Sequence, residues 1–266
     1  MRFSNLHTHT TFSDGAGTVR ENIESAIAKN MLSLGFSDHS FTACDTSYCM
    51  KLSDYAAYRR EVNAMKAEYE GRIPVFLGME KDYYSEIDNS EYDYVIASVH
   101  YIVHKGVCYP IDHSRIQQED CIREVFGGDV LSMAKCYYDM VAEHASLAKP
   151  TVIGHFDVLN KFSIMPEDDE RYRKITLDAM DEAAKYCKCF EVNTGGISRG
   201  WRKNPYPNDY LLKHLLEIGG EVVINSDSHH PNNLDFYFEE SAQILRNVGF
   251  KHFSVFNGRG FDKINL

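Results

Sequence analysis

The feature that most constrains the fold is a series of short apolar runs that each stop on a histidine or a carboxylate. Residues 73–80 end on Glu80, residues 92–100 end on His100, and residues 150–155 end on His155. Near-continuous apolar runs of this length are typical of strands buried on both faces of a parallel sheet. Helix-like segments separate the runs, so the sequence predicts an α/β fold.

Six of the predicted strands end on, or run just past, a His, Asp or Glu. In a parallel α/β barrel, the C-terminal ends of all strands meet at one mouth and bring together residues that are distant in sequence. We therefore expect an α/β TIM-like barrel with its functional site at the C-terminal ends of the strands.

The remaining elements are predicted from periodicity and capping residues. A capping-box spacing at Thr18 begins the first helix, and Ser53 is expected to cap a helix that ends near Gly71. Further helices are predicted over residues 131–146, 167–185, 207–218 and 238–247, and further strands over 3–9, 32–36, 189–193, 221–229 and 251–256. Residues 101–149 form a long insertion with a short hairpin around residues 104–106, and it either builds a substrate pocket or decorates the surface.

Length and charge limit the class of protein. The 266 residues suit one large domain, residues 1–266, better than two small ones. The formal charge of −11, from 28 basic and 39 acidic residues, comes without any Lys/Arg run. A protein that binds the phosphates of a nucleic acid needs a basic patch, so we expect no nucleic-acid partner.

The compartment is predicted from what the chain lacks. It opens on a strand, with no basic-then-apolar signal segment, and no stretch approaches the roughly 18 apolar residues that cross a bilayer. We expect a cytoplasmic protein with no membrane partner. The seven cysteines lack any Cys-x-x-Cys spacing and are expected to be free thiols.

The first strand carries the clearest metal-binding pattern. His7 and His9 point to the same face of a strand, and Asp14 follows a few residues later. Alone, the pair could be two ordinary packed histidines, but other strand ends supply more ligands. The candidates are His7, His9, Asp14, His39, Glu80, His100, His155, Asp227 and His229. Nine ligands suffice for two or three divalent ions, and mixed nitrogen and oxygen donors suit Zn²⁺, Mn²⁺ or Fe²⁺.

These residues stand in a recognisable order. The motifs are His7-x-His9, Ser13-Asp14-Gly15, Asp38-His39, Gly78-Met-Glu80, Ser98-Val-His100, Gly154-His155 and Asp227-Ser-His229. The order resembles the polymerase and histidinol phosphatase (PHP) superfamily along essentially the whole chain. The insertion after His100 and the segment ending at Asp157 resemble its histidinol-phosphate phosphatases of histidine biosynthesis.

The resemblance implies a distorted (β/α)7 barrel, a trinuclear metal centre and hydrolysis of L-histidinol phosphate by a metal-bridging hydroxide. Carried over by residue, it implies three ligand sets. One ion would use His7, His9, Glu80 and Asp227, a second would use Glu80 as a bridge with His100 and His155, and a third would use Asp14, His39 and His229.

Residues outside these sets could serve a phosphate monoester. Two cations are candidates for binding the phosphate anion, namely Arg199, in a Gly-rich loop, and Lys161. Arg199 is the stronger candidate, because a guanidinium can donate two hydrogen bonds to phosphate whereas a lysine supplies only a point charge. His230 could contact phosphate or protonate the leaving oxygen, or lie at the surface. Asp38 could act as the general acid, or it could orient a metal ligand without binding the metal itself.

Recognition of the histidinol part should need a carboxylate and an aromatic ring near the mouth. Candidates are Phe12, Tyr101, Asp112 and Glu119. The other histidines, at positions 104, 113, 144, 214 and 252, are expected to be ordinary solvated or packed residues.

Two alternatives stay open. One is a phosphoesterase of the same superfamily acting on a nucleotide, an oligonucleotide end or phosphotyrosine, although the acidic charge disfavours an oligonucleotide. The other is a binding module that kept the barrel and lost the chemistry. A small-molecule phosphate monoester is the expected partner, and the sequence leaves the oligomeric state open.

Overall fold

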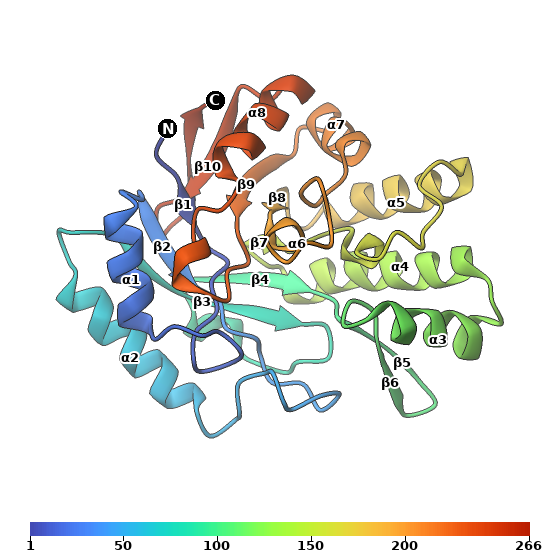
Figure 1. Ribbon diagram of the computed structural model, residues 1–266, viewed down its shortest axis with the longest axis horizontal. Coiled ribbons are helices and arrows are strands. Elements are labelled where there is room, and N and C mark those ends of the chain that lie inside the picture. Colours follow the sequence, from blue (N-terminus) through green and yellow to red (C-terminus); the bar gives the residue numbers. More distant parts are fainter.

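The computed structural model describes residues 1–266 and is built on a seven-stranded parallel sheet, in the order β1-β2-β3-β4-β7-β8-β9 (Figure 1). Its strands are β1 (Ser4–Asn5), β2 (Ser33–Phe36), β3 (Val75–Asp82), β4 (Tyr94–Ser98), β7 (Val152–Ile153), β8 (Cys189–Asn193) and β9 (Glu221–Asn225). Just past β1 and β9, the His9 amide donates to the Ser228 carbonyl at 2.9 Å, and the Ser228 amide donates to the His7 carbonyl at 3.1 Å. These bonds close the sheet, so the predicted TIM-like barrel is confirmed.

Six of the helices lie around this sheet (Figure 1). They are α1 (Val19–Ala28), α2 (Tyr55–Glu68), α4 (Val130–Ala148), α5 (Glu170–Ala183), α7 (Asp209–Glu217) and α8 (Phe238–Val248). The predicted capping box of α1 is present, because the Glu21 amide donates to the Thr18 hydroxyl at 3.2 Å and the Thr18 amide donates to the Glu21 carboxylate at 2.8 Å. Val19, Ile23 and Ala26 are fully buried on the inner face of the helix.

One buried tyrosine shows how closely the barrel interior is packed. The Tyr94 hydroxyl donates to the carbonyl of Phe36 at 2.9 Å and to that of Leu6. A Cβ atom at Gly35 would lie 2.4 Å from the Tyr94 hydroxyl, and one at Gly78 would lie 2.2 Å from its ring. Both positions therefore require glycine. One cluster of 61 buried residues connects the strands with the surrounding helices.

The insertion after β4 contains more structure than predicted. The expected hairpin is present as β5 (Tyr101–His104) and β6 (Val107–Pro110), and α4 matches the predicted helix. A further helix, α3 (Arg115–Phe126), lies between them. Its signal was Ser114, whose hydroxyl accepts from the Gln117 amide at 3.3 Å as an N-cap.

The last strand does not complete the barrel. β10 (His252–Phe256) pairs antiparallel with an unpredicted strand, β11 (Phe261–Asn265). Because β1 and β9 already close the parallel sheet, no edge remains for β10 within it. Its aromatic side chains pack beside the barrel instead, with Phe253 at 5.6 Å from Phe3 and Phe256 at 5.0 Å from Phe76 between ring centroids.

Smaller differences concern caps and loops. The residue before α2 is Asp54, which makes no side-chain capping bond, so the predicted cap at Ser53 is wrong. The Gly-rich loop contains a short helix, α6 (Gly195–Ser198). Three 3-10 turns complete the secondary structure, η1 (Asn89–Glu91), η2 (Val158–Asn160) and η3 (Pro231–Asn233). None of the helices combines the length and apolar character needed to cross a membrane.

The prediction that all cysteines are free is wrong for one pair. Cys44 and Cys108 form a disulfide between the loop after β2 and strand β6, with their Cα atoms 5.5 Å apart. The two positions are 64 residues apart, so no sequence spacing revealed their proximity. The other five cysteines are free thiols, and all of these except Cys136 are buried.

Candidate metal centre

A cavity of about 320 Å³ opens at the C-terminal mouth of the barrel, where the sequence placed the site. Seven of the nine predicted ligands line it, namely Asp14, His39, Glu80, His100, His155, Asp227 and His229. The other two, His7 and His9, are fully buried and lie against Glu80 and Asp227. The strand-end pattern therefore brings all nine side chains into one cluster.

The deepest part of the cluster joins the first strand to β3 and the end of β9. His7 Nε2 lies 3.2 Å from Glu80 Oε2, and His9 Nε2 lies 3.2 Å from Asp227 Oδ1. The predicted strand over residues 3–9 is shorter in the structure, because β1 ends at Asn5, but the ring centroids of His7 and His9 still lie 5.1 Å apart. This group corresponds to the first predicted ligand set.

The second predicted set lies around the other oxygen of Glu80. His155 Nε2 is 3.0 Å from Glu80 Oε1, His100 Nε2 is 3.4 Å from the same oxygen, and the two Nε2 atoms are 3.3 Å apart. Glu80 thus presents one oxygen to each of the two groups, which is the arrangement a bridging carboxylate needs.

The third predicted set overlaps the first. His229 Nε2 lies 3.3 Å and His39 Nε2 lies 3.8 Å from the Asp14 carboxylate. The ligand atoms of His9 lie within 4.8 Å of this same group, and His39 Nδ1 is 2.7 Å from Glu80 Oε2. His9 and His39 could therefore serve either set, and the geometry does not divide the nine residues into three separate sites.

Unpaired polar atoms provide the test of whether a metal fits here. The buried atoms His7 Nε2, both ring nitrogens of His9 and Glu80 Oε2 have no hydrogen-bond partner. Leaving such groups buried and unpaired costs free energy. Because they converge on one point and are imidazole or carboxylate donors, the residues present fit divalent cations such as Zn²⁺, Mn²⁺ or Fe²⁺.

The electrostatics favour the metal-binding forms of two of these groups, Glu80 and His9. Burial would raise the pKa of Glu80, but His39, His7 and His100 hold it well below its usual value, so the carboxylate is ionised. Burial, together with the charges of His229 and His39, lowers the pKa of His9 to about 3, so its ring is neutral. An ionised carboxylate and a neutral imidazole are the forms that bind metals.

Two acidic residues behind the ligands were not predicted from the sequence. Glu191 Oε2 lies 2.9 Å from His7 Nδ1, and its other oxygen accepts from the His155 amide at 2.6 Å. Asp82 Oδ2 lies 3.1 Å from His100 Nδ1. Such partners fix the orientation of each ring, so that its Nε2 atom would be the one to bind a metal. The sequence did contain signals for both residues. Glu191 is a carboxylate in the middle of an apolar strand, and Asp82 is an acid two residues after Glu80, on the same face of β3.

The backbone at Asp227 is unusual. Its φ of +49° lies in the left-handed region, which costs a non-glycine residue roughly 1–2 kcal/mol. The carboxylate is held on both sides, because Asp227 Oδ1 faces His9 and its Oδ2 accepts from Arg199 at 2.8 Å.

Both predicted phosphate-binding cations line the cavity. Arg199 lies beside Asp227 and His229, and its NH1 atom is 3.2 Å from His229 Nδ1. Lys161 Nζ lies 3.3 Å from Asp112 Oδ2, and both residues line the cavity. An anion in the cavity would therefore meet positive charge in addition to the metal ligands.

Two predicted residues do not reach the cavity. Asp38 is fully buried and accepts from the Thr10 amide at 2.8 Å and from the Ser13 hydroxyl at 2.6 Å, so it holds the loop that carries Asp14. In this placement Asp38 contacts the loop that carries a predicted ligand and does not line the cavity. His230 is exposed, and its Nδ1 accepts from the Asn232 amide at 3.1 Å, so it is not among the residues that line the cavity.

Of the four candidates for recognising the histidinol part of the substrate, two line the cavity and two do not. Tyr101 and Asp112 line the cavity. Phe12 packs on Tyr58 with ring centroids 5.4 Å apart, and Glu119 pairs with Arg115 along α3 at 2.8 Å. Further lining residues were not predicted, namely Asp45, Ser47, Tyr48, His113 and Tyr206. His113 was expected to be an ordinary histidine, whereas the other four histidines of that group do lie outside the cavity.

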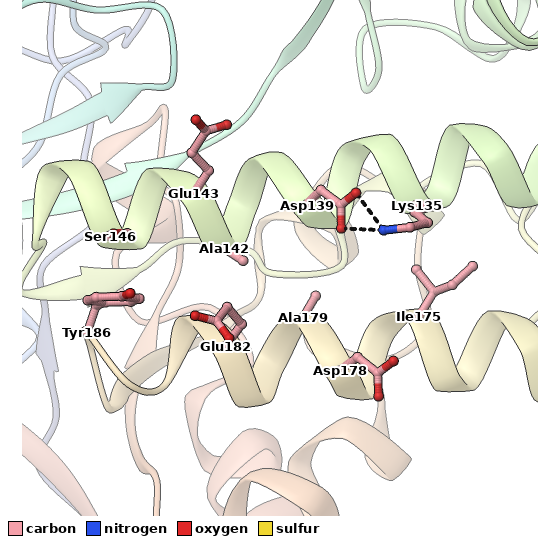
Figure 2. A pocket seen from close by; sticks show the side chains of 10 residues that line it. All are labelled: Lys135, Asp139, Ala142, Glu143, Ser146, Ile175, Asp178, Ala179, Glu182 and Tyr186. Atoms are coloured by element: carbon pink, nitrogen blue, oxygen red, sulfur yellow. Dashed lines mark hydrogen bonds and ion pairs between the residues drawn. The ribbon is translucent and has the colours of Figure 1, made fainter.

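The insertion contributes to the wall of the cavity at the barrel mouth. Its first part supplies Tyr101, Pro110 and Asp112 to the wall of the site. A second cavity, of about 410 Å³, lies between α4 and α5 (Figure 2). Its lining carries no histidine, and Lys135 there is paired with Asp139 at 2.7 Å (Figure 2). This cavity is separate from the candidate metal centre.

Fold and site together define a class: a parallel α/β barrel that gathers histidine and carboxylate ligands for more than one divalent ion at its C-terminal mouth. The family model of the PHP domain matches residues 5–195. The chain belongs to the PHP family, as the order of its motifs indicated.

Relatives resemble this chain along most of its length. It is 30% identical to a probable histidinol-phosphatase of Deinococcus radiodurans, covering 91% of this chain and 92% of the relative. It is 24% identical to the histidinol-phosphatase of Bacillus subtilis, covering 88% and 96%. Among solved structures, histidinol phosphate phosphatase of Lactococcus lactis, complexed with zinc, L-histidinol and phosphate, has a TM-score of 0.70 at 20% identity over 98% of this chain and 99% of that one. That likeness confirms the fold.

Proposed function

We propose that this protein hydrolyses L-histidinol phosphate to L-histidinol and phosphate, using two or three divalent ions held by the nine clustered ligands. The observation that carries the proposal is the convergence of these ligands, with Glu80 presenting one oxygen to each of two groups, beside Arg199 and Lys161. The relatives named histidinol-phosphatase, which match most of the chain, support the substrate.

The bound ions would supply an activated water and offset the negative charge of the phosphoryl group. The chain's own residues would bind and orient the ester. Arg199 offers a planar guanidinium with donors for two phosphate oxygens, while Asp227 holds it at 2.8 Å. Lys161, which also lines the cavity, adds a point charge. The ligands Glu80 and His9 are buried, so they are shielded from bulk water.

The histidinol part would lie towards Tyr101 and Asp112. Burial would raise the pKa of Asp112, but Lys161, His100 and His155 bring it to about 2, so the carboxylate is ionised at neutral pH. It can accept a hydrogen bond from the ammonium group or the imidazole of the substrate, and the Tyr101 ring can cover the apolar part.

We further infer that residues 1–266 act as one domain, since a single apolar cluster of 61 residues spans it. A cytoplasmic place in histidine biosynthesis follows from the proposed substrate. We propose no nucleic-acid partner, because the net charge of −11 would repel one.

A substrate panel tests the proposal. Protein with counted metals is assayed for phosphate release from L-histidinol phosphate, nucleotides, sugar phosphates and phosphotyrosine. We expect the highest kcat/KM for L-histidinol phosphate. A higher value for another ester would keep the metal centre and transfer the function to that substrate, while no release from any ester would favour a binding module.

A further inference from the structure

The mouth of the candidate site is built by two segments that are distant in sequence. The loop after β2 contributes Asp45, Ser47 and Tyr48, and the region around β5 and β6 contributes Tyr101 and Asp112. The loop, residues 42–49, contains no helix or strand. Its position over the site must therefore be determined by contacts with its surroundings.

Tyr48 is the residue through which this loop reaches the centre. Its ring meets the His39 ring edge-on, with centroids 4.7 Å apart, and stacks beside Tyr101 at 6.3 Å. The Tyr48 hydroxyl is buried and has no hydrogen-bond partner. Tyr48 thus covers one predicted ligand and presents an unpaired polar group at the wall of the substrate cavity.

One covalent bond connects the two segments. No backbone hydrogen bond joins residues 42–49 to residues 101–113, and Tyr48 meets Tyr101 through their side chains. The ends of the loop are held elsewhere, because the Phe41 amide donates to the Tyr55 hydroxyl at 2.6 Å and the Met50 amide donates to the His39 carbonyl at 3.0 Å. Between these anchors, the Cys44–Cys108 disulfide links the loop to β6 across the mouth. Both cysteines are partly exposed, so a thiol can reach them.

We propose that Cys44 and Cys108 form a reversible dithiol–disulfide clasp that sets the position of Tyr48 and thereby the affinity for substrate. A dithiol reductant opens the clasp. One of its thiolates attacks a sulfur of the disulfide and displaces the other cysteine as a thiolate, and its second thiol then releases the enzyme from the mixed disulfide. Two electrons and two protons pass to the cysteines, and the reductant becomes a disulfide.

The kinetic consequence rests on the proposed function. With the clasp closed, the wall that contains Tyr48 and Asp112 is formed before the substrate arrives. With the clasp open, binding must also order the loop, so we expect KM for L-histidinol phosphate to rise about fivefold while kcat changes less than about twofold. The metal ligands do not include either cysteine, so metal content should stay the same.

The test compares oxidised and dithiol-reduced protein after the reagents are removed. Titration should find five free thiols in the oxidised chain, and seven after reduction. The double variant Cys44→Ser/Cys108→Ser should have the high KM of the reduced protein under both conditions. Cys136→Ser, a partly exposed cysteine on α4, is the matched control and should keep the redox response. An equal KM in both forms, or a response that survives in the double variant, would overturn the proposal.

A second readout does not depend on turnover. Lys51 is exposed just beyond the loop, so trypsin should cut there faster in the reduced protein and in the double variant. Failure of every ester to react would reject the proposed function, and the thiol count and the cleavage rate would still decide on the clasp. Seven thiols under oxidising conditions, or equal cleavage rates in the two forms, would reject the clasp.

Discussion

Glu191 holds His7 from behind the candidate metal centre, and its substitution isolates what such support contributes. In Glu191→Gln, the 2.9 Å contact with His7 Nδ1 loses its negative charge while the side-chain shape is kept. Loss of a partner of this kind typically costs 10–100-fold in metal affinity or activity, and we expect a metal affinity at least about tenfold lower. Competition with a chromophoric chelator measures it. Glu182→Gln, an exposed acid on α5, is the control, and equal affinities would refute the positioning role.

Arg199 tests the anion-binding part of the site. A charge-assisted hydrogen bond contributes roughly 1.5–3 kcal/mol, so Arg199→Ala should lower kcat/KM for L-histidinol phosphate by roughly 10–100-fold. Steady-state kinetics at constant metal content measure the loss. Arg171→Ala removes an arginine that is 76% exposed on α5 and should change kcat/KM less than about twofold. If both variants behaved alike, Arg199 would have no part in binding phosphate.

Single residues also show where sequence reasoning ends. His7, Glu80 and Asp227 were found because strand ends converge in a barrel. Asp38 is an aspartate like Asp227 and stands beside the predicted ligand His39 in the sequence. Its carboxylate nevertheless faces the Thr10 amide and the Ser13 hydroxyl. The direction of a side chain at the end of a strand depends on the following loop, and the sequence does not specify that loop.

At the scale of elements, the cap of α1 gives a prediction that separates stability from chemistry. Thr18→Ala removes the acceptor of the Glu21 amide and should lower the free energy of unfolding by about 1 kcal/mol. Urea unfolding measures the change. Thr18→Ser keeps the hydroxyl and should retain most of the stability. Because α1 lies on the outside of the barrel, kcat/KM should be the same in all three proteins, and a loss of activity would contradict this description.

Elements with strong local signals were predicted well. β8 matches its predicted residues, and β3, β4 and β7 differ by a few residues at their ends, because apolar runs bounded by polar residues are local features. The pairing of β10 with β11 and the Cys44–Cys108 bond depend on which segments meet in space. Such contacts leave no periodicity in a single sequence, which is why the sequence did not reveal them.

For the whole molecule, metal binding should be coupled to protons. In the metal-free protein, burial lowers the pKa of His7, but the nearby carboxylates of Glu191, Glu80 and Asp227 raise it well above 6.5. Burial also lowers the pKa of His100, but Glu80 and Asp82 raise it well above 6.5. Both rings are therefore protonated at neutral pH and must lose a proton to bind metal. Metal affinity should rise at least about tenfold from pH 6 to pH 8, with proton release detected by calorimetry in buffers of different ionisation enthalpy.

The same shifts have the opposite effect on the metal-free fold. A pKa raised by folding adds stability that is fully present below the unfolded value of about 6.5 and is lost as the pH rises through the folded pKa. The metal-free protein should therefore have a lower Tm at pH 8.5 than at pH 6, and added metal should abolish this trend. A metal affinity independent of pH would contradict the ligand assignment.

The most direct test of the central claim is a metal titration of chelated protein, followed by phosphate release from L-histidinol phosphate and by elemental analysis of the same samples. We predict no release without metal and full activity at two to three ions per chain. Release at the full rate by metal-free protein, or full metal occupancy without release, would contradict the claim that this nine-residue cluster is the catalytic centre of a phosphatase.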